Sequence, residues 1–407
     1  MKKMTIRDVD VSGKRVFVRV DFNVPLDEAT GIITDDGRIR AVLPTINYLV
    51  DHGAKIILCS HLGRPDGKIV EALRMTSVAG RLAQIMGRPV NMVEDCVGAE
   101  VEKSAADLKD GQILLLDNVR FHPEEEAGDP SFAQALAKLG DIYVNDAFAV
   151  SHRCHASIVG ITEYLPSVAG LLLEKEIDTM GHILENPAHP FAALVGGSKV
   201  GDKVSLLENI MNKVDFILVG GGMAATFLKA KSCEVGRSKV ENERLDTAVD
   251  LMSRARRNGV RLLLPVDVMV TEEISAGAKG IIVPVERISP KHRIVDIGPS
   301  TMHNFREVLR RCQTVFWNGP MGIFEIPQFA EGTKAMANEI SRLKATTVIG
   351  GGSTAEIVAS LKLEDKMTLV STGGGASLQY LGGQKLPGVE ALLDRNSPVA
   401  VKLRGSR

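Results

Sequence analysis

Short apolar segments alternate along the chain with longer segments in which apolar residues recur every three or four positions. This alternation is typical of buried parallel strands joined by helices, and it predicts an α/β protein. The predicted strands are Arg15–Val20, Lys55–Cys59, Gln112–Leu116, Asp141–Val144, Phe191–Val195, Phe216–Val219, Arg261–Pro265, Thr314–Trp317, Thr346–Ile349 and Thr368–Val370. The clearest predicted helices are Thr76–Met86 and Val204–Val214.

The residues that follow the predicted strands differ between the two halves of the chain. In the first half they form polar loops at Asp21-Phe22-Asn23, His61-Leu62-Gly63-Arg64 and Asn118–His122. In the second half they form glycine turns at Gly196-Gly197, Gly220–Gly222, Gly350–Gly352 and Gly373–Gly375. Ligands of open parallel sheets bind outside the carboxyl ends of the strands, so the two halves are predicted to bind two different ligands.

Length and composition set limits on this picture. A chain of 407 residues is too long for one ordinary core, so we expect two domains. The net charge of -1 creates no overall field that would attract nucleic acid or a membrane surface. The five cysteines are scattered, which predicts reduced thiols, and no apolar run is long enough for a signal peptide or a membrane span. We therefore expect a cytoplasmic protein.

The glycine turns of the second half predict a phosphate site, because glycine lets a ligand approach the backbone and a helix N-terminus offers free N–H groups. Ser353 and Glu356 are spaced as a capping box at such a helix start. Lys199 and Lys203 follow Gly196-Gly197 and would suit nucleotide phosphates, although Asp202 stands where a P-loop would need its lysine.

Cationic side chains of the first half predict an anion receptor. Arg38, Arg64, Arg120 and Arg153 lie with His61 in or near loops that follow strands, and arginine binds carboxylate and phosphate in a bidentate manner. The spacing of Ser151–His155 matches no known zinc pattern. The run Glu124–Glu126 is interpreted as a solvated loop, and no serine nucleophile motif is present.

Two alternatives from other classes remain at this point. A nicotinamide-dependent dehydrogenase would use Gly220–Gly222 as its dinucleotide turn, with Glu241 as the acidic residue about 20 positions on. Glu241, however, falls in a polar, helix-like stretch, and the glycine turn is one of four. A non-catalytic nucleotide-binding protein would leave the clustered arginines without a purpose.

Longer motifs resemble the phosphoglycerate kinase family nearly from end to end. They are Val18–Pro25, His61–Pro65, Asn118–Phe121, Gly197–Val200, Gly220–Met223, Asp296–Pro299, Trp317–Glu325, Ser371–Ser377 and Leu386–Val389. The resemblance implies the glycolytic and gluconeogenic reaction 1,3-bisphosphoglycerate + ADP = 3-phosphoglycerate + ATP, by direct in-line transfer on domain closure. It implies two Rossmann-like domains that face each other across a hinged cleft.

The resemblance also assigns roles to residues. Those expected to bind phosphoglycerate are Asp21, Phe22, Asn23, Arg38, His61, Leu62, Gly63, Arg64, Arg120 and Arg153. Those expected to bind the nucleotide are Lys203, Gly220, Gly221, Gly222, Gly319, Pro320, Glu325, Gly351, Gly352, Ser353 and Thr354. Those expected to act on the transferring phosphoryl group are Arg38, Lys199, Lys203, Gly352 and Gly375.

The family implies Mg²⁺ bound with ADP or ATP. Many members carry an aspartate where this chain has Ser353, and a hydroxyl is a weaker magnesium ligand than a carboxylate. We therefore assign no protein ligand to the metal. The serine and the compact first half are more like archaeal members.

The implied domain organisation has four parts. Residues 1–169 form a phosphoglycerate-binding domain, 170–185 a hinge helix, 186–385 a nucleotide-binding domain and 386–407 a segment that returns to the first domain. Glu163–Gly170 is interpreted as a connector that leads into the helix. Small-molecule substrates are the expected partners, without nucleic acid or membrane, and the expected state is a monomer, with a dimer as the alternative.

Overall fold

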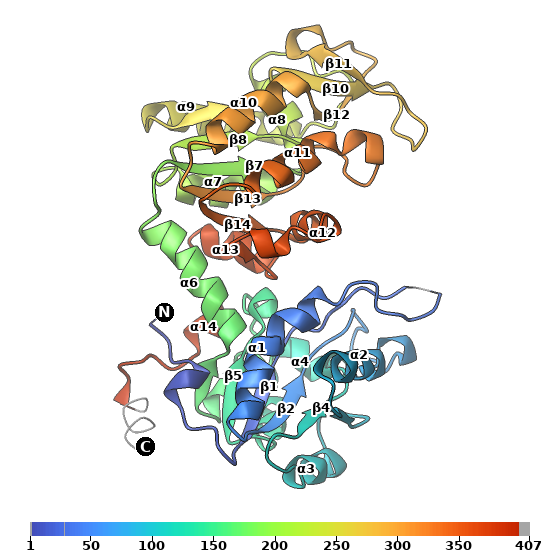
Figure 1. Ribbon diagram of the computed structural model, residues 1–407, viewed down its shortest axis with the longest axis vertical. Coiled ribbons are helices and arrows are strands. Elements are labelled where there is room, and N and C mark those ends of the chain that lie inside the picture. Colours follow the sequence, from blue (N-terminus) through green and yellow to red (C-terminus); the bar gives the residue numbers. More distant parts are fainter. Residues whose placement is uncertain (1, 28, 399–407) are drawn as a thin grey trace. The chain divides into compact units, whose positions relative to one another are not determined.

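The computed structural model describes residues 2–27 and 29–398, which form two compact units (Figure 1). Unit 1 contains the described residues up to 178 together with those from 385 onward, and unit 2 contains residues 179–384. Each unit is built on a six-stranded parallel sheet flanked by helices, so the predicted α/β class is confirmed.

The sheet of unit 1 has the strand order β3-β4-β2-β1-β5-β6, and all its pairs are parallel. Its strands are β1 (Arg15–Arg19), β2 (Lys55–Cys59), β3 (Asn91–Met92), β4 (Ile113–Leu115), β5 (Ile142–Asn145) and β6 (Ser167–Ala169). The central strands are buried on both faces, which explains their nearly continuous apolar sequences.

The helices of unit 1 cover this sheet and are placed by short loops. They are α1 (Gly37–Asp51), α2 (Thr76–Met86), α3 (Ala99–Ala106), α4 (Pro123–Ala127), α5 (Pro130–Ala137) and α14 (Pro387–Glu390). The helix α6 (Leu171–Glu185) begins in unit 1 and ends in unit 2. Its first N–H groups donate to Thr45 Oγ1 and Asp146 Oδ1, which therefore define where the helix begins.

The main sheet of unit 2 has the order β15-β14-β13-β7-β8-β9 and is also parallel. Its strands are β7 (Phe191–Val195), β8 (Phe216–Val219), β9 (Arg261–Leu263), β13 (Thr314–Asn318), β14 (Thr346–Gly350) and β15 (Leu369–Val370). A second, antiparallel sheet consists of β10 (Asp267–Thr271), β11 (Ile281–Pro284) and β12 (Arg293–Ile297).

The helices of unit 2 connect the strands of both sheets. They are α7 (Val204–Ile210), α8 (Met223–Ala230), α9 (Leu245–Arg257), α10 (Pro299–Leu309), α11 (Glu331–Ile340), α12 (Gly352–Ser360) and α13 (Gly375–Leu381). Trp317 on β13 is fully buried in the core between the sheet and α10–α12. The indole Nε1–H donates to the carbonyl of Gly319, so the core reaches directly to the loop that follows β13.

Several sequence predictions agree with these bounds and others need correction. The strands at Lys55–Cys59, Phe191–Val195 and Phe216–Val219 and the helix at Thr76–Met86 are confirmed. The helix predicted to run to Val214 ends at Ile210. The predicted connector at Glu163–Gly170 is wrong, because it contains β6, which pairs with β5 in the sheet of unit 1.

The chain returns to unit 1 after Gln384. Backbone hydrogen bonds join this segment to the first residues and to β6, from Met4 N to Leu393 O and from Leu393 N to Ser167 O. Gly388 N also donates to Ser151 O in the loop after β5. Residues 399–407 of the predicted returning segment lie outside the described residues.

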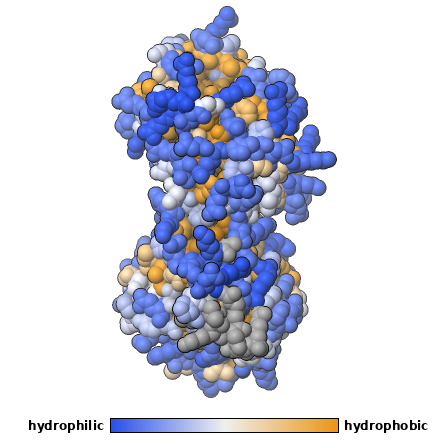
Figure 2. Space-filling model, turned by 90° about the vertical axis from the view of Figure 1, so that its left-hand side faces the viewer, coloured by the Kyte–Doolittle hydropathy of each residue, from blue (hydrophilic) through white to orange (hydrophobic). Residues whose placement is uncertain are grey.

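Hydrophilic residues cover most of the face drawn in Figure 2, and hydrophobic residues appear between them in patches. Within the described part of the chain, no helix combines the length and apolar character that crossing a bilayer requires.

Candidate functional site

The parallel order of the unit 1 sheet gathers the predicted anion-binding loops. The strands β4, β2, β1 and β5 are neighbours, and the loops after them therefore emerge at one edge of the sheet. These loops carry Arg120, His61, Asp21 and Arg153 respectively. Arg38 reaches the same edge from the first turn of α1, where it forms an ion pair with Asp21.

The Asp21 carboxylate organises the centre of this edge. It is nearly buried, accepts the Asn23 N–H at 3.0 Å and lies 4.0 Å from His61 Nδ1. Burial alone would raise the pKa of Asp21, but the Arg38 charge and the hydrogen bond from the Asn23 amide help to lower the pKa below its ordinary value. Asp21 is therefore ionised at neutral pH and holds the Arg38 guanidinium in place.

His61 is buried and neutral. Burial lowers its pKa well below the ordinary value, and the charges of Arg19, Arg120 and Arg38 lower it further, against the opposing effect of Asp21. Arg19 Nη2 lies 3.3 Å from His61 Nδ1, and a guanidinium only donates, so Nδ1 is the acceptor. The ring proton consequently lies on Nε2, where it is available to an anionic ligand.

A fully buried arginine, Arg19, contacts His61 and holds its ring in place. Arg19 donates to Ser157 Oγ at 2.8 Å and lies 4.0 Å from Glu125 Oε1, whose carboxylate also accepts from Ser157. Burial raises the pKa of Glu125, while Arg19 and Ser157 oppose this effect. The interpretation of Glu124–Glu126 as a solvated loop is therefore wrong for Glu125, which is 0% exposed on α4. Neither Arg19 nor Glu125 was predicted.

Hydrogen bonds to its backbone hold the His61–Arg64 turn. Gly63 has φ of 64°, a conformation that favours glycine; its N–H donates to Asn23 Oδ1 at 2.7 Å and its carbonyl accepts from Arg120 Nη1 at 3.0 Å. Asn23 and Arg120, which are predicted to bind the ligand, therefore also hold this turn in position. Arg120 Nε also lies 3.0 Å from Glu126 Oε1, and this carboxylate neutralises part of the positive charge of the guanidinium.

The other predicted residues of unit 1 fall into two groups. Phe22 and Leu62 are buried in the core of unit 1, next to the predicted anion-binding loops. Arg64 and Arg153 are exposed. Burial lowers the pKa of Arg120, and Arg19 and Arg153 lower it further, which indicates that these cations are near one another. Burial and the same arginines lower the pKa of His155 to about 3, so the edge is strongly electropositive.

Unit 2 contains a cavity of about 840 Å³ at the carboxyl ends of its strands. The predicted residues that line it are Lys199, Lys203, Gly221, Gly222, Gly319, Pro320, Glu325, Gly351, Gly352, Ser353, Thr354 and Gly375. Gly220 is buried behind this wall and does not line the cavity. Gly220 packs closely on Met321, because a Cβ there would lie 2.4 Å from the Met321 sulfur.

Two glycines allow the loops to pack backbone against backbone at the base of the cavity. Gly319 has φ of 94°, and a Cβ there would come within 2.5 Å of Gly196. Gly221 has φ of 63°, and a Cβ there would lie 2.5 Å from the Pro320 carbonyl. By contrast, a Cβ at Gly352 or Gly375 would meet no protein atom within 4 Å. These two glycines therefore face the space in which a ligand would lie.

The start of α12 offers free N–H groups to this space. The N-cap residue is Gly351, with φ of 93°, and no side chain caps the helix. The predicted Ser353–Glu356 capping box is therefore wrong, because the helix begins one residue before Ser353. Thr354 Oγ1 accepts the Gly319 N–H at 2.7 Å instead, which fixes the helix start to the loop after β13. A helix N-terminus without a cap is a ready anion site.

Lys203 places a positive charge at the cavity wall. Its side chain is nearly buried, and within the described parts of the chain no carboxylate lies in ion-pair distance of its ammonium group. Burial lowers the pKa of Lys203, and Asp202 opposes this effect. The backbone around Lys199–Lys203 is held by Glu241, whose carboxylate accepts the Val200 and Gly201 N–H groups. Glu241 is thus engaged inside the protein and does not serve as a ribose ligand.

The cavity is also lined by polar residues to which the sequence assigned no role. They are Arg237, Ser238, Lys239, Arg293 and Asp296. Asp296 is buried and accepts the Gly332 and Ile297 N–H groups, and burial raises its pKa to about 7. Arg293 and Asp296 belong to β12 of the antiparallel sheet. No strand was predicted there, although Asp296–Pro299 was noted as a family motif.

The sequence model of the family described as phosphoglycerate kinase matches residues 6–384. The chain belongs to this family. Three bacterial phosphoglycerate kinases are similar over 97% of the chain and 100% of their own length, with identities of 51% for Dictyoglomus turgidum and 50% each for Pelotomaculum thermopropionicum and Moorella thermoacetica. Family membership excludes the dehydrogenase alternative.

Two solved structures of phosphoglycerate kinases are similar as well. The Coxiella burnetii structure has a TM-score of 0.85 and 38% identity, and covers 96% of this chain and 98% of its own. The Pyrococcus horikoshii structure has a TM-score of 0.81 and 30% identity, and covers 98% of this chain and 100% of its own.

Proposed function

We propose that unit 1 binds phosphoglycerate, that unit 2 binds ADP or ATP, and that phosphoryl transfer joins the two sites in the reaction 1,3-bisphosphoglycerate + ADP = 3-phosphoglycerate + ATP. The chain is an enzyme of the phosphoglycerate kinase family, and this is the reaction of that family. The observation that carries the division of roles is the cavity of unit 2, where an uncapped helix start, glycine turns and a buried lysine converge.

The electropositive edge of unit 1 suits a small acidic phosphate compound. Arg64, Arg120 and Arg153 can pair with phosphate or carboxylate oxygens, and the His61 Nε2–H can donate one hydrogen bond. The Asp21 carboxylate can accept hydrogen bonds from hydroxyl groups of the ligand, and the Asn23 amide can both accept and donate them. Both side chains also hold the loops in place. The turn at Gly63 is tied to both Asn23 and Arg120, so these two side chains are held in fixed positions.

The cavity of unit 2 suits a nucleotide. We assign the phosphates to the N–H groups of Gly352, Ser353 and Thr354 and to the turn at Gly375, because nothing in the protein fills the space beside these glycines. Glu325 is the proposed ribose ligand. Gly221, Gly222, Gly319 and Pro320 form the flat wall against which a purine ring would pack.

No general base is required for the transfer. The accepting carboxylate has an ordinary pKa near 4 and is already ionised at neutral pH. The protein therefore needs to orient donor and acceptor and to neutralise charge on the transferring group. Arg38, held by Asp21, and Lys203, which pairs with no carboxylate of residues 2–27 and 29–398, are the cations proposed to do this, with Lys199, Gly352 and Gly375 beside them. The two substrate-loaded units must come together for reaction, which would also exclude water.

Magnesium is proposed to enter with the nucleotide. The cavity wall near Lys203 offers the Asp202 carboxylate and the Ser353 hydroxyl, which fit a magnesium ion that keeps most of its shell as phosphate oxygens and water. When bound, the ion would neutralise phosphate charge. We propose a cytoplasmic monomer, with small-molecule substrates as its partners.

A coupled assay tests this function. Purified chain is mixed with 3-phosphoglycerate and Mg-ATP, and formation of 1,3-bisphosphoglycerate is followed by its reduction with an added dehydrogenase. Turnover is expected with 3-phosphoglycerate and not with glycerate, which lacks the phosphate that the arginines of unit 1 would bind. Nucleotide binding without turnover would contradict the proposed reaction and leave the fold and the cavity unaffected.

A further inference from the structure

Two loops of unit 1 bring together three ligand-type side chains that have no role in the proposed substrate sites. The strands β3 and β4 are parallel neighbours, so the loops after them emerge at the same edge of the sheet. The first loop carries Asp95 and Cys96, and the second ends at His122, the residue before α4. The Asp117 N–H donates to the Asp95 carbonyl at 3.3 Å, which ties the two loops to each other.

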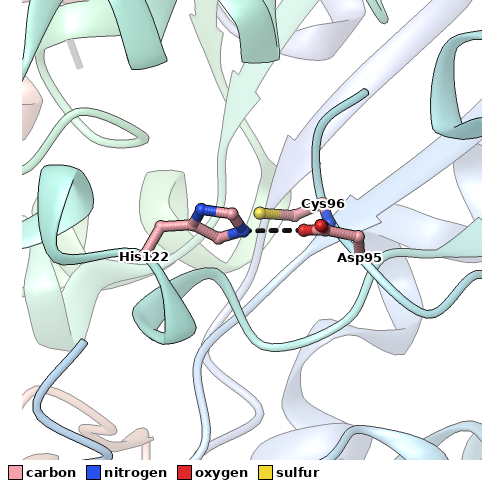
Figure 3. A group of neighbouring side chains, drawn as sticks. All are labelled: Asp95, Cys96 and His122. Carbon is pink, nitrogen blue, oxygen red and sulfur yellow. Dashed lines mark hydrogen bonds and ion pairs between the residues drawn. The ribbon is translucent and has the colours of Figure 1, made fainter. Parts of the chain in front are cut away.

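The side chains of Asp95, Cys96 and His122 point toward a common point (Figure 3). One ligand atom from each lies within 4.8 Å of the other two. His122 Nε2 is 2.7 Å from Asp95 Oδ1, and the Cys96 sulfur lies on the same side of the imidazole ring in Figure 3. The Phe132 ring is 5.1 Å from the His122 ring, measured between centroids, and restricts its rotation.

We propose that Asp95, Cys96 and His122 bind a divalent transition-metal ion of the zinc type. A thiolate, an imidazole and a carboxylate are the donor set that zinc and cobalt accept, in a tetrahedral arrangement with water in the fourth position. Magnesium is a poor occupant, because it prefers oxygen ligands in an octahedral shell. The proposed site is therefore distinct in chemistry from the magnesium that accompanies the nucleotide.

The spacing of the three ligand atoms would have to change to accept such an ion. Zinc lies about 2.0–2.3 Å from its ligands, which places tetrahedral ligand atoms roughly 3.3–3.6 Å apart. The Asp95–His122 hydrogen bond would therefore lengthen by under about 1 Å as the ion replaces the proton between them. Asp95 can make this movement, since its side chain is 52% exposed, whereas Cys96 is fully buried and fixes the third corner.

Acidic residues of the two loops lie close together around the proposed site. Asp95 supplies one carboxylate, and the N–H of Asp117 on the second loop donates to the Asp95 carbonyl, which places Asp117 beside it. The Cys96 thiol must lose its proton to bind the ion, and a directly coordinated metal supplies the positive charge that makes this possible. Two cations nearby are paired with carboxylates: Arg74, just before α2, with Asp117 and Glu71, and Arg120, on the second loop, with Glu126.

Cobalt provides a direct test on the full-length chain. Co²⁺ is titrated into the protein in the presence of excess Mg²⁺, and the absorbance is recorded. The expected result is one equivalent of Co²⁺ with a thiolate-to-cobalt charge-transfer band and the strong visible bands of four-coordinate cobalt, which added Zn²⁺ then removes. Zn²⁺ is also expected to raise the melting temperature.

Variants separate this site from adventitious binding. Cys96→Ser is expected to abolish the charge-transfer band, whereas Cys154→Ser, at an exposed thiol, and Cys59→Ser, at another buried thiol, should keep it. Asp95→Asn and His122→Asn change partly exposed side chains and should weaken Co²⁺ binding at least tenfold. Circular dichroism of each metal-free variant checks its fold.

Several outcomes would overturn the proposal. They are the absence of a thiolate band at millimolar Co²⁺, a band that persists in Cys96→Ser, or unchanged Co²⁺ affinity in both Asp95→Asn and His122→Asn. If Cys96→Ser does not fold, the Asp95 and His122 variants decide the question, because binding that survives both would assign the metal to other residues.

Discussion

The Arg38 side chain has two roles in the proposed mechanism. It pairs with the ionised Asp21 carboxylate, and it must also stabilise charge on the transferring phosphoryl group. An arginine can meet both, because its guanidinium presents five donors in a planar fork. The pair with Asp21 thus orients the guanidinium before substrate arrives.

Replacement of Arg38 tests its role in transfer. We expect Arg38→Ala to lower kcat by about 10³-fold, as for other arginines that stabilise a transferring phosphoryl group. Steady-state kinetics with 3-phosphoglycerate and Mg-ATP measure the effect. Arg40→Ala is the matched control, since Arg40 lies on the same helix and pairs with Asp36 at its exposed start. A change confined to KM in Arg38→Ala would mean that Arg38 only binds substrate.

In the proposed function, the hydroxyl of Ser353 at the start of α12 is one of the two protein groups offered to magnesium. We expect Ser353→Asp to lower the Mg²⁺ concentration that gives half-maximal activity, because a carboxylate is the stronger magnesium ligand. A Mg²⁺ titration at fixed ATP measures this. Ser353→Asn has similar size without the charge and should behave like the unaltered enzyme. Identical titration curves for all three proteins would discard the idea.

At the residue scale, the sequence pointed to residues of the loops after the strands but not to the buried residues that hold them. Glu124, Glu125 and Glu126 are chemically identical, and only the folded chain distinguishes Glu125, which α4 directs inward to Ser157 and Arg19. Arg19 lies in a predicted strand, where an inward-facing arginine has no local signal. Such buried pairs depend on residues far apart in sequence, so local patterns do not reveal them.

Strands and helices were predictable where the physical signal is strong. The central parallel strands are buried on both faces and therefore appear as continuous apolar runs. The strands β3 and β6 have two and three residues and leave no such run. The antiparallel sheet was missed, and its edge strand β11 exposes Ile281 and Ile282, so its sequence lacks the usual polar and apolar alternation.

Asp146, in the loop after β5, is a titratable residue that binds the N-terminus of α6 and should affect stability. Asp146 Oδ1 accepts the Leu172 and Leu173 N–H groups, and burial raises the pKa of Asp146 to about 7 against these hydrogen bonds. An acid with a raised pKa binds its proton more tightly when folded. Its contribution to stability is therefore present below its unfolded pKa of about 4 and is lost as the pH rises through 7.

Asp146→Asn removes this titration and keeps an oxygen acceptor for the helix N–H groups. We expect the decrease in unfolding free energy between pH 5 and pH 8 to become smaller in the variant. Urea unfolding at several pH values measures the difference. Asp110→Asn, at an exposed position, is the control. An unchanged pH dependence in Asp146→Asn would show that Asp146 does not titrate in this interval.

On the scale of the whole molecule, both ends of the described chain belong to unit 1. The two ends are joined by backbone hydrogen bonds, from the Met4 N–H to the Leu393 carbonyl and from the Arg395 N–H to the Lys2 carbonyl. Lys3 also forms an ion pair with Asp394. The residues that line the unit 2 cavity all lie between Gly197 and Leu378. The returning segment therefore completes one unit without contributing to the ligand cavity of the other. Only the family resemblance, and no local pattern, predicted this return.

Deletion of residues 386–407 should therefore destabilise unit 1 selectively. The segment buries Leu386, Val389 and Leu392, and each buried side chain of this size contributes about 1.5–3 kcal/mol. The sum approaches the total stability of an ordinary domain, which is about 5–15 kcal/mol. Hydrogen exchange measured by mass spectrometry should show lost protection in β1, β5 and β6, with protection in β7 and β13 retained.

A milder substitution separates packing from chain length. Leu392→Ala leaves the backbone hydrogen bonds of the segment in place and should cost about 2–4 kcal/mol, with the same distribution of lost protection. Glu390→Ala, at an exposed neighbouring position, should change little. Nucleotide affinity, measured by calorimetry, should stay within about twofold in all three proteins, because the cavity residues are untouched. Equal loss of protection in β1 and β13 would instead mean that the two units unfold together, and the segment would then stabilise the whole chain.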